Sequence, residues 1–377
     1  MNIRNMDIIR TIHPVGQGGF YTETLESDSG KHTVVYDCGG SSKKSMEEYL
    51  KKYLHKDSSG NRMEIDAVFI SHLHADHING LEYLLNNANV RLLILPQLTE
   101  EMKWEALVFN RCHHADGEAV NQFVLGLYGD NGRSFDTRIV QVNPAEPESQ
   151  VDIEGDRLQL DAGSFLYKTD IHSGVHLGFN DGWMYIPYNP PVMSHGKDLY
   201  AEIKAGLGLL HDFSFTELPA ILKKKKTVEQ CRSIYESCFG KNHNSYSMTL
   251  FSGTWAPGCF SILPSRRHHA RYKYRSLSPN CLYTGDFEPN PFIGGLKHFY
   301  QPLWETIQSI QVPHHGSREN YHPALYEFAE RGFISVGETN RYHHPNIDTL
   351  IHIQDEGCYP VVVTENLNTM RIFHYLD

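Results

Sequence analysis

Three histidines and one aspartate lie within the six residues 72–77, in the pattern His-x-His-x-Asp-His. An apolar run with β-branched residues, 65–70, comes directly before them, and residues 79–87 have the spacing of an amphipathic helix. We therefore expect the cluster on a strand-to-helix loop, where α/β proteins bind ligands. Imidazole nitrogens and carboxylate oxygens suit Zn²⁺, Mn²⁺ or Fe²⁺. The candidate ligands are His72 and His74 for one ion, and Asp76 and His77 for a second.

Polar side chains also follow other predicted strands. An alternating strand at 32–37 ends in Asp-x-Gly, and a strand at 281–286 ends in Thr-Gly-Asp. Two further strands lead into His-His-Gly-Ser at 314–317 and His-His-Pro at 343–345. The two strand ends that carry histidines are expected at the same edge of a sheet. The residues concerned are Asp37, Asp286, His314, His315 and His344.

Composition limits the class of protein. The 377 residues can form two average domains or one large α/β domain with insertions. The net charge of −11 gives no overall support for binding a polyanion, so a nucleic-acid enzyme would need a local basic surface. Seven scattered cysteines without a Cys-x-x-Cys pair indicate a reduced, cytoplasmic chain. The absence of a signal-like N-terminus or a long apolar run predicts a protein without a membrane segment.

The motif at 72–77 resembles the signature of the metallo-β-lactamase fold hydrolases. The order of all the motifs is similar to that in the metallo-β-lactamase domain of ComEC-type competence proteins and their free-standing relatives. The resemblance covers about residues 8–95 and 241–377. It implies an α/β fold of the αββα type, in which two sheets are sandwiched between helices, and a site for two divalent ions, Zn or Mn.

The resemblance also implies roles for single residues. Asp37 would support the metal loop from behind, and Asp286 would bridge the two ions. Asp76 would orient the attacking water or take its proton, and His314 or His315 would donate a proton to the leaving group. His344 is the expected last ligand, although its role and that of the His314–His315 pair could be exchanged. The remaining ligand is His243, unless Asn244 occupies that position.

Residues 100–240 lose the regular strand–helix alternation and match no family motif. We interpret them as an insertion in a single domain of residues 1–377, forming a wall or lid over the substrate. The aromatic and proline-rich stretch 183–191 is expected to form a strand or sheet edge. Lysines 223–226 are interpreted as a solvated helix face. Beyond the insertion, residues 323–331 are expected to form a helix.

A basic segment shortly before Asp286 supplies the local positive charge that a nucleic-acid enzyme needs. Its cations could contact phosphates and its tyrosines could stack on bases, although a solvated loop is the alternative. The leading hypothesis is a two-metal phosphodiesterase or nuclease acting on nucleic acid or nucleotides. The alternative is a hydrolase of a small lactone, thioester or cyclic nucleotide, with a closed pocket built from 100–240 and lined by 183–191. The cations concerned are Arg266, Arg267, Arg271, Lys273 and Arg275.

Overall fold

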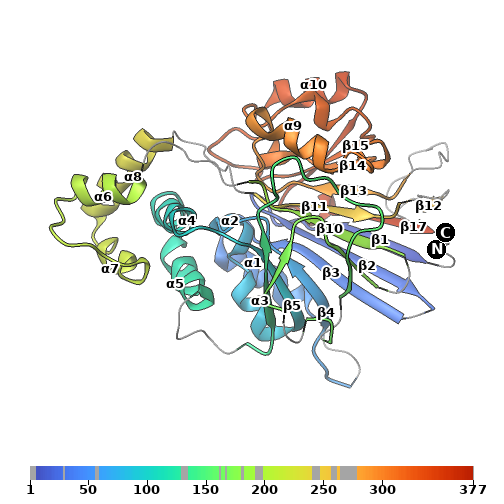
Figure 1. Ribbon diagram of the computed structural model, residues 1–377, viewed down its shortest axis with the longest axis horizontal. Coiled ribbons are helices and arrows are strands. Elements are labelled where there is room, and N and C mark those ends of the chain that lie inside the picture. The colour runs from blue at the N-terminus through green and yellow to red at the C-terminus, as the bar shows by residue number, and fades with distance from the viewer. Residues whose placement is uncertain are drawn as a thin grey trace.

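Two β-sheets pack face to face, and helices cover the outer face of each (Figure 1). This is the αββα arrangement that the sequence predicts. No described helix is both long and apolar enough to cross a membrane. The computed structural model describes residues 6–28, 30–55, 59–128, 135–160, 163–165, 168–179, 182–191, 198–239, 247–255, 261–263 and 278–376.

The first sheet has nine strands in the described residues, and its middle strands are parallel. Strand β4 carries the metal motif at its end and lies between β3 and β5, with five of its six residues buried. In order across the sheet, the strands are β12 (Ser261–Leu263), β17 (Arg371–Leu376), β1 (Asp7–Ile12), β2 (Phe20–Ser27), β3 (Gly30–Cys38), β4 (Glu64–Phe69), β5 (Asn89–Pro96), β6 (Arg138–Asn143) and β8 (Asp170–His172).

The second sheet has eight strands in the described residues, four of them parallel neighbours near the C-terminus. The aromatic stretch predicted as a possible edge forms an inner strand, β10, which pairs with a neighbour on each side and is fully buried. The strands in order are β16 (Tyr359–Val363), β15 (Arg331–Ser335), β14 (Ser309–Gln311), β13 (Cys281–Tyr283), β11 (Thr249–Gly253), β10 (Met184–Tyr188), β9 (His176–Gly178) and β7 (Arg157–Gln159).

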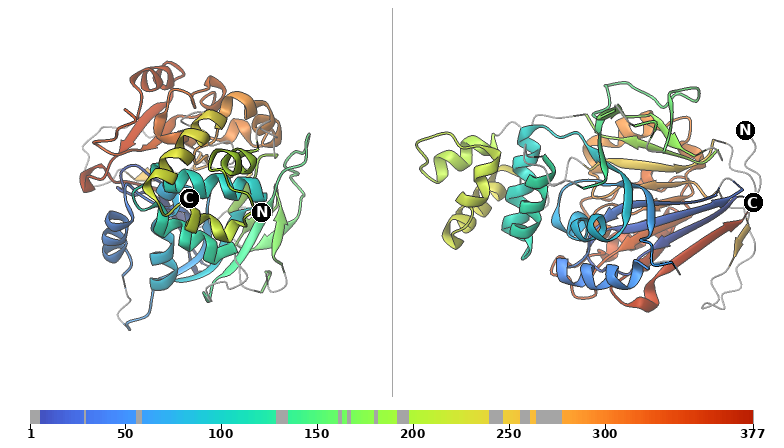
Figure 2. Two further views of the ribbon diagram at one scale, coloured as in Figure 1. Left: turned by 90° about the vertical axis from the view of Figure 1, so that its left-hand side faces the viewer. Right: turned by 90° about the horizontal axis from the view of Figure 1, so that it is seen from below.

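Helices α1 and α3 cover the first sheet and α9 and α10 the second, while α4 to α8 extend from one end of the sandwich (Figures 1 and 2). The two termini lie at the opposite end. The helices are α1 (Lys43–Tyr53), α2 (Ala75–Ile78), α3 (Leu81–Asn87), α4 (Glu100–His113), α5 (Gly117–Tyr128), α6 (Leu199–Gly206), α7 (Leu218–Ile221), α8 (Lys225–Phe239), α9 (Pro289–Phe299) and α10 (Ile347–Asp355). Single 3₁₀ turns are η1 (Phe215–Glu217), η2 (Trp304–Thr306), η3 (Pro313–Gly316), η4 (Pro323–Leu325) and η5 (Leu367–Thr369).

Three apolar clusters fill the spaces between these layers. One lies between the two sheets and includes Ile8 and Leu250. Another lies between the second sheet and the helices α9 and α10, and it includes Leu296 and Ile353. The third joins the first sheet to α1 and α3 and continues into α4, α5, α6 and α8. The helices at the end of the sandwich therefore share a core with the sheet that carries the metal motif.

The structure differs from the sequence prediction at residues 323–331 and within residues 100–240. Residues 323–331 form only the turn η4 before β15 begins, because the parallel pairing of β15 with β14 and β16 extends to Arg331. Within 100–240, strands β6 to β10 belong to the two sheets, and only the helices of this stretch stand outside the sandwich. The role of the stretch as a substrate wall stays a prediction.

Candidate metal centre

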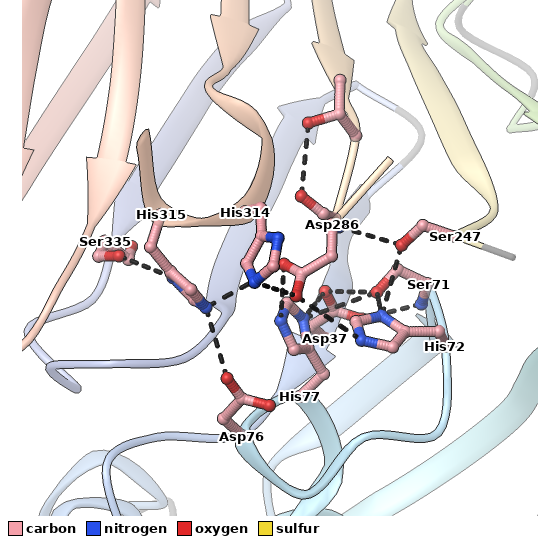
Figure 3. Close-up of polar contacts among 12 residues, drawn as sticks. Asp37, Ser71, His72, Asp76, His77, Ser247, Asp286, His314, His315 and Ser335 are labelled. Atoms are coloured by element: carbon pink, nitrogen blue, oxygen red, sulfur yellow. Dashed lines mark hydrogen bonds and ion pairs between the residues drawn. The ribbon is translucent and has the colours of Figure 1, made fainter. Parts of the chain in front are cut away.

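The predicted motifs meet at the carboxyl ends of three strands, β4 of the first sheet and the parallel neighbours β13 and β14 of the second (Figure 3). The 72–77 loop follows β4, Asp286 follows β13, and the His314–His315 pair follows β14 in the turn η3. Strands of both sheets thus contribute to one cluster, as the edge rule for α/β sheets predicts.

Asp37, at the end of β3, forms hydrogen bonds with Ser71 and His77 and so fixes the position of the 72–77 loop. Its carboxylate accepts hydrogen bonds from the backbone N–H of Ser71 at 2.7 Å and from the Ser71 hydroxyl at 2.9 Å. Nδ1 of His77 donates to the same carboxylate at 2.8 Å. A carboxylate that binds the far nitrogen of a ligating histidine fixes the tautomer and the orientation of the ring. Asp37 therefore holds Ser71 and His77 in place, and its role in supporting a bound metal stays a prediction.

His72 is oriented through a serine. The Ser71 hydroxyl donates its only proton to Asp37, so it can only accept a hydrogen bond from Nδ1 of His72, 2.9 Å away. His72 must therefore carry its proton on Nδ1. Nε2 of His72 is buried and makes no hydrogen bond with the described residues.

The two histidines of η3 are held in the same way. Nδ1 of His315 donates to the carbonyl oxygen of Ser335 at 2.8 Å. Asn320 donates its amide to the carbonyl of Phe287 at 3.0 Å, which turns its Oδ1 toward Nδ1 of His314, also 3.0 Å away. All four histidines therefore have Nδ1 engaged, and their Nε2 atoms are left to converge on the carboxylates.

The two oxygens of Asp286 divide these nitrogens into two sets. Oδ2 lies 3.8 Å from Nε2 of His72 and 3.7 Å from Nε2 of His314. Oδ1 lies 3.1 Å from Nε2 of His77 and 3.9 Å from Nε2 of His315, which is also 3.3 Å from Oδ2 of Asp76. Among the residues that the structure describes, two groups bring one ligand atom from each member within 4.8 Å of one another and so could hold a metal ion. The groups are His72, His77 and Asp286, and Asp76, His77 and His315.

The electrostatics of the cluster suit a cation. Burial opposes charge on Asp286, but the neighbouring His314 and His77 outweigh it and hold the pKa of its carboxyl well below the usual value. Burial also acts to lower the pKa of His77, but Asp286, Asp37 and Asp76 raise it well above the ordinary value. Burial lowers the pKa of His72 to about 3. One proton on His77 thus balances buried carboxylates, a role that a divalent cation would fill with every imidazole neutral.

The backbone is strained where it presents these groups. Asp37, His314 and His315 have φ of 57°, 47° and 55°, a left-handed region that residues other than glycine rarely adopt. Gly285, with φ of 56°, leaves no room for a side chain, because a Cβ there would lie 2.6 Å from the Cβ of Ser71. Asp286 therefore approaches the 72–77 loop only because a glycine precedes it.

The other predicted site residues have different outcomes. His74 is buried and stacks on Phe109, with ring centroids 3.9 Å apart, and lies beside His72 but outside both candidate groups. His314 and His344 also lie outside both groups, with their ring centroids 5.6 Å apart, although Nε2 of His314 is 3.7 Å from Oδ2 of Asp286. His243, its alternative Asn244 and the basic segment lie outside the described residues. That segment comprises Arg266, Arg267, Arg271, Lys273 and Arg275.

Sequence reasoning missed the residues that orient the histidines. Ser71 was available as the residue next to the motif, but nothing in the sequence marks Asn320. The sequence also does not show the contact of Ser247, whose hydroxyl accepts from the backbone of Asp286 at 2.9 Å. It also missed His114 at the end of α4, whose Nε2 lies 3.9 Å from Oδ1 of Asp76. These partners become visible only once the strands are assembled.

Comparison with known families agrees with this architecture. Residues 25–182 match the family model of the metallo-beta-lactamase superfamily, and the rest of the cluster lies beyond that match on the same two-sheet sandwich. The chain has the metallo-β-lactamase fold. Within this fold the resemblance to ComEC-type domains is a finer assignment that the family match does not test. No curated protein sequence matches the chain.

Three solved structures are similar at low identity. The metallo-beta-lactamase fold protein YhfI from Bacillus subtilis is 9% identical, with a TM-score of 0.38 over 98% of this chain and 100% of that one. A diphosphatase of the PhnP family is 10% identical, with a TM-score of 0.33 over 97% and 88%. A long-form RNase Z from yeast is 11% identical, with a TM-score of 0.29 over 96% and 37%. Because all three TM-scores are below 0.5, the fold assignment rests on the family match and on the sandwich itself.

Proposed function

We propose that this metallo-β-lactamase fold protein is a metal-dependent hydrolase of phosphodiesters in nucleic acid or nucleotides, with two divalent ions, Zn or Mn, as cofactors. One observation carries the proposal: four histidines, three of them buried and His314 with 14% of its side chain exposed, have Nδ1 engaged and direct Nε2 toward the two oxygens of Asp286. Such a carboxylate suits a position between two cations.

The geometry supports an assignment of the ligands. One ion would lie between His72, His314 and Oδ2 of Asp286, with His74 beside it, and the other between Asp76, His77, His315 and Oδ1 of Asp286. In the sequence prediction, His344 is the last ligand, and an exchange of roles with the His314–His315 pair is left open. This assignment is that exchange, because His315 takes the ligand position. When bound, the ions would make water nucleophilic near neutral pH and neutralise charge in the transition state.

The remaining groups would then act on the substrate. Asp76 is the most exposed carboxylate of the cluster, with 13% of its side chain accessible, so it can contact the attacking water as well as an ion. His344 is partly exposed beside His314, so we propose that it contacts the leaving oxygen. The substrate would approach from the side of these two residues.

The alternative, a small lactone, thioester or cyclic nucleotide as substrate, needs an enclosed pocket at the metals. The cavity that touches His72 and His74 has a volume of about 20 Å³, enough for about one water molecule. The aromatic strand expected to line a pocket is buried in the second sheet, and the indole N–H of Trp183 donates to Ser252 at 3.1 Å. Both observations favour a substrate that reaches the metals from an open side. The predicted basic segment 266–275 supports a polyanionic one.

The test is hydrolysis of single-stranded and double-stranded DNA, RNA and cyclic nucleotides with added Mn²⁺ or Zn²⁺. We expect cleavage of a phosphodiester by the wild type and a loss of at least about 10³-fold in the Asp76→Ala/His77→Ala variant. An Asp156→Ala/His172→Ala variant is a matched control, because it removes an exposed Asp–His pair, 3.4 Å apart, outside the cluster. Stoichiometric metal binding without cleavage of any phosphodiester would overturn the proposal, and small esters would then be tested.

A further inference from the structure

A cationic cleft lies next to the metal centre. It has a volume of about 410 Å³ and is formed by the end of α4, the start of α8 and the loop after β15. Five cationic side chains and one carboxylate line it, in a chain whose net charge is −11. They are Arg111, Lys223, Lys225, Arg232, Arg341 and Glu229. A local excess of positive charge in an acidic protein is the pattern expected where a phosphate binds.

The cleft is connected to the proposed catalytic residues on two sides. His114 lines it and also places Nε2 3.9 Å from Oδ1 of Asp76. Arg341 lines it from the same loop that carries His344, three residues further along. A chain that passes through the cleft therefore reaches the side of the cluster where Asp76 and His344 lie.

Two of the arginines that line the cleft are held in place by hydrogen bonds. Arg232 donates to the carbonyl oxygen of Cys112, and Arg341 donates to the carbonyl oxygen of His113 at 2.8 Å. These carbonyls end α4, where cations also offset the helix dipole. A guanidinium anchored through one nitrogen still has other N–H groups for an anion, so the arginines are positioned in advance of binding.

The four lysines 223–226 differ in whether they line the cleft. Lys223 and Lys225 line the cleft, whereas Lys224 and Lys226 do not, although all four are exposed. Lys223 forms no ion pair with the described residues, and Lys225 is 3.8 Å from Glu229 with both side chains largely in solvent. The sequence prediction of a solvated helix face thus holds for the exposure of the run, but half of the run also belongs to the cleft.

We propose that this cleft binds a phosphate of an oligonucleotide, next to the phosphodiester that is cleaved at the metal centre. The inference rests on the proposed function and narrows it: the preferred substrate is a single strand with at least two phosphates, not an isolated phosphodiester. The cleft is open, so the strand can continue beyond it. Arginine forks and flexible lysines are the side chains that bind backbone phosphates without reading sequence.

The experiment compares Lys223→Gln/Lys225→Gln with the matched control Lys224→Gln/Lys226→Gln, which removes the same charge from the same run. We measure kcat/KM for a single-stranded ten-nucleotide oligomer and for bis(p-nitrophenyl) phosphate, which has one phosphate. We expect kcat/KM for the oligomer, divided by kcat/KM for bis(p-nitrophenyl) phosphate, to fall about 5–10-fold in the Lys223→Gln/Lys225→Gln variant. The slope of log binding constant against log salt concentration should become smaller by about one. The control variant is expected to keep the wild-type ratio.

Binding separates a failure of this inference from a failure of the proposed function. Fluorescence anisotropy of the labelled oligomer is measured in EDTA, with the Asp76→Ala/His77→Ala background, so that no cleavage is required. Weaker binding in the cleft variant alone supports the cleft, even if the wild type cleaves no phosphodiester. Equal weakening in both lysine variants would show a general charge effect and overturn the inference, as would an unchanged affinity in both. Thermal melting confirms that each variant is folded.

Discussion

Two buried polar clusters of this protein have opposite characters. Between the sheets, Arg10 and Glu23 form an ion pair with Nε and Oε1 2.7 Å apart, and every charged atom has partners. Oε1 of Glu23 also accepts from the hydroxyl of Tyr283 at 2.8 Å, and Oε2 accepts from Tyr185 and Ser252. At the strand ends, by contrast, Nε2 of His72 has no hydrogen bond with the described residues, and four imidazoles converge on one carboxylate.

The difference separates a structural role from a functional one. A buried charge whose hydrogen bonds are all made within the protein has nothing left to offer a ligand, and it fixes how the two sheets pack. A buried cluster with unsatisfied, converging nitrogens lacks a partner that the chain itself does not supply. Burial and polarity alone therefore do not identify a site, whereas incomplete hydrogen bonding does.

The largest effect on stability is expected at the ion pair. Glu23→Gln leaves the fully buried Arg10 without a counter-charge, so the free energy of unfolding should fall by about 3–5 kcal/mol. Urea denaturation at pH 7 measures it. Glu26→Gln on the same strand breaks an exposed pair with Lys31 and should cost less than about 1 kcal/mol. Equal losses in the two variants would contradict a structural role for the buried network.

A smaller effect, but one on function, is expected from Asp37→Asn. The amide has one acceptor oxygen, so it cannot accept from the Ser71 backbone N–H at one position and from the Ser71 hydroxyl and Nδ1 of His77 at the other, and the support of the loop and of the histidine is weakened. Metal affinity and kcat/KM should each fall about 10–100-fold. The matched control is Asp66→Asn, a buried carboxylate of β4 that accepts from the backbone of Thr33 at 2.8 Å, away from the metal loop. It should lower stability but not metal affinity, as measured by titration of the metal-free protein.

The sequence predicts the functional cluster better than the structural one. The motif at 72–77 and Asp37 follow parallel strands of the first sheet, and Asp286 and the His314–His315 pair follow parallel strands of the second. Within each sheet parallel strands bring their ends to one edge, and the packing of the two sheets then brings the two edges together. Whether His315 or His344 belongs to the ligand group depends on what holds each ring. The carbonyl of Ser335 holds His315, and that contact exists only in the assembled sheet.

The Arg10–Glu23 pair shows why contacts between the two sheets cannot be predicted from the sequence. In the sequence, both are charged residues in alternating strands, where such positions usually face solvent. They face the space between the sheets because β1 and β2 are covered on that side by strands more than 150 residues away, which also supply the hydroxyls of Tyr185 and Tyr283. The helix expected at 323–331 failed for a similar reason, since strand pairing at Arg331 overrides a local pattern.

The ion pair and the metal cluster should also lose their effects in different pH ranges, and this is the smallest of the expected differences. Burial acts to raise the pKa of Glu23, but Arg10 and the hydrogen bonds from Ser252 and Tyr283 outweigh it, so the folded-state pKa lies below the ordinary value of 4.5. The ion pair therefore contributes its full stability above about pH 4.5, and the contribution is lost as pH falls through the folded-state pKa. Metal binding must displace the proton of His77, whose pKa is raised well above the ordinary imidazole value of about 6.5, so metal affinity weakens at higher pH than the ion pair does.

Urea denaturation of the wild type and of Glu23→Gln in EDTA, at pH values from 8 to 3.5, tests this order, beside metal titrations at the same pH. The stability difference between the two proteins should stay constant down to about pH 5 and then shrink by at most about 1.4 kcal/mol per pH unit. Metal affinity should already decline between about pH 7 and 5. If the stability difference instead declined together with metal affinity, the two clusters would be coupled, and the division into a structural and a functional cluster would be wrong.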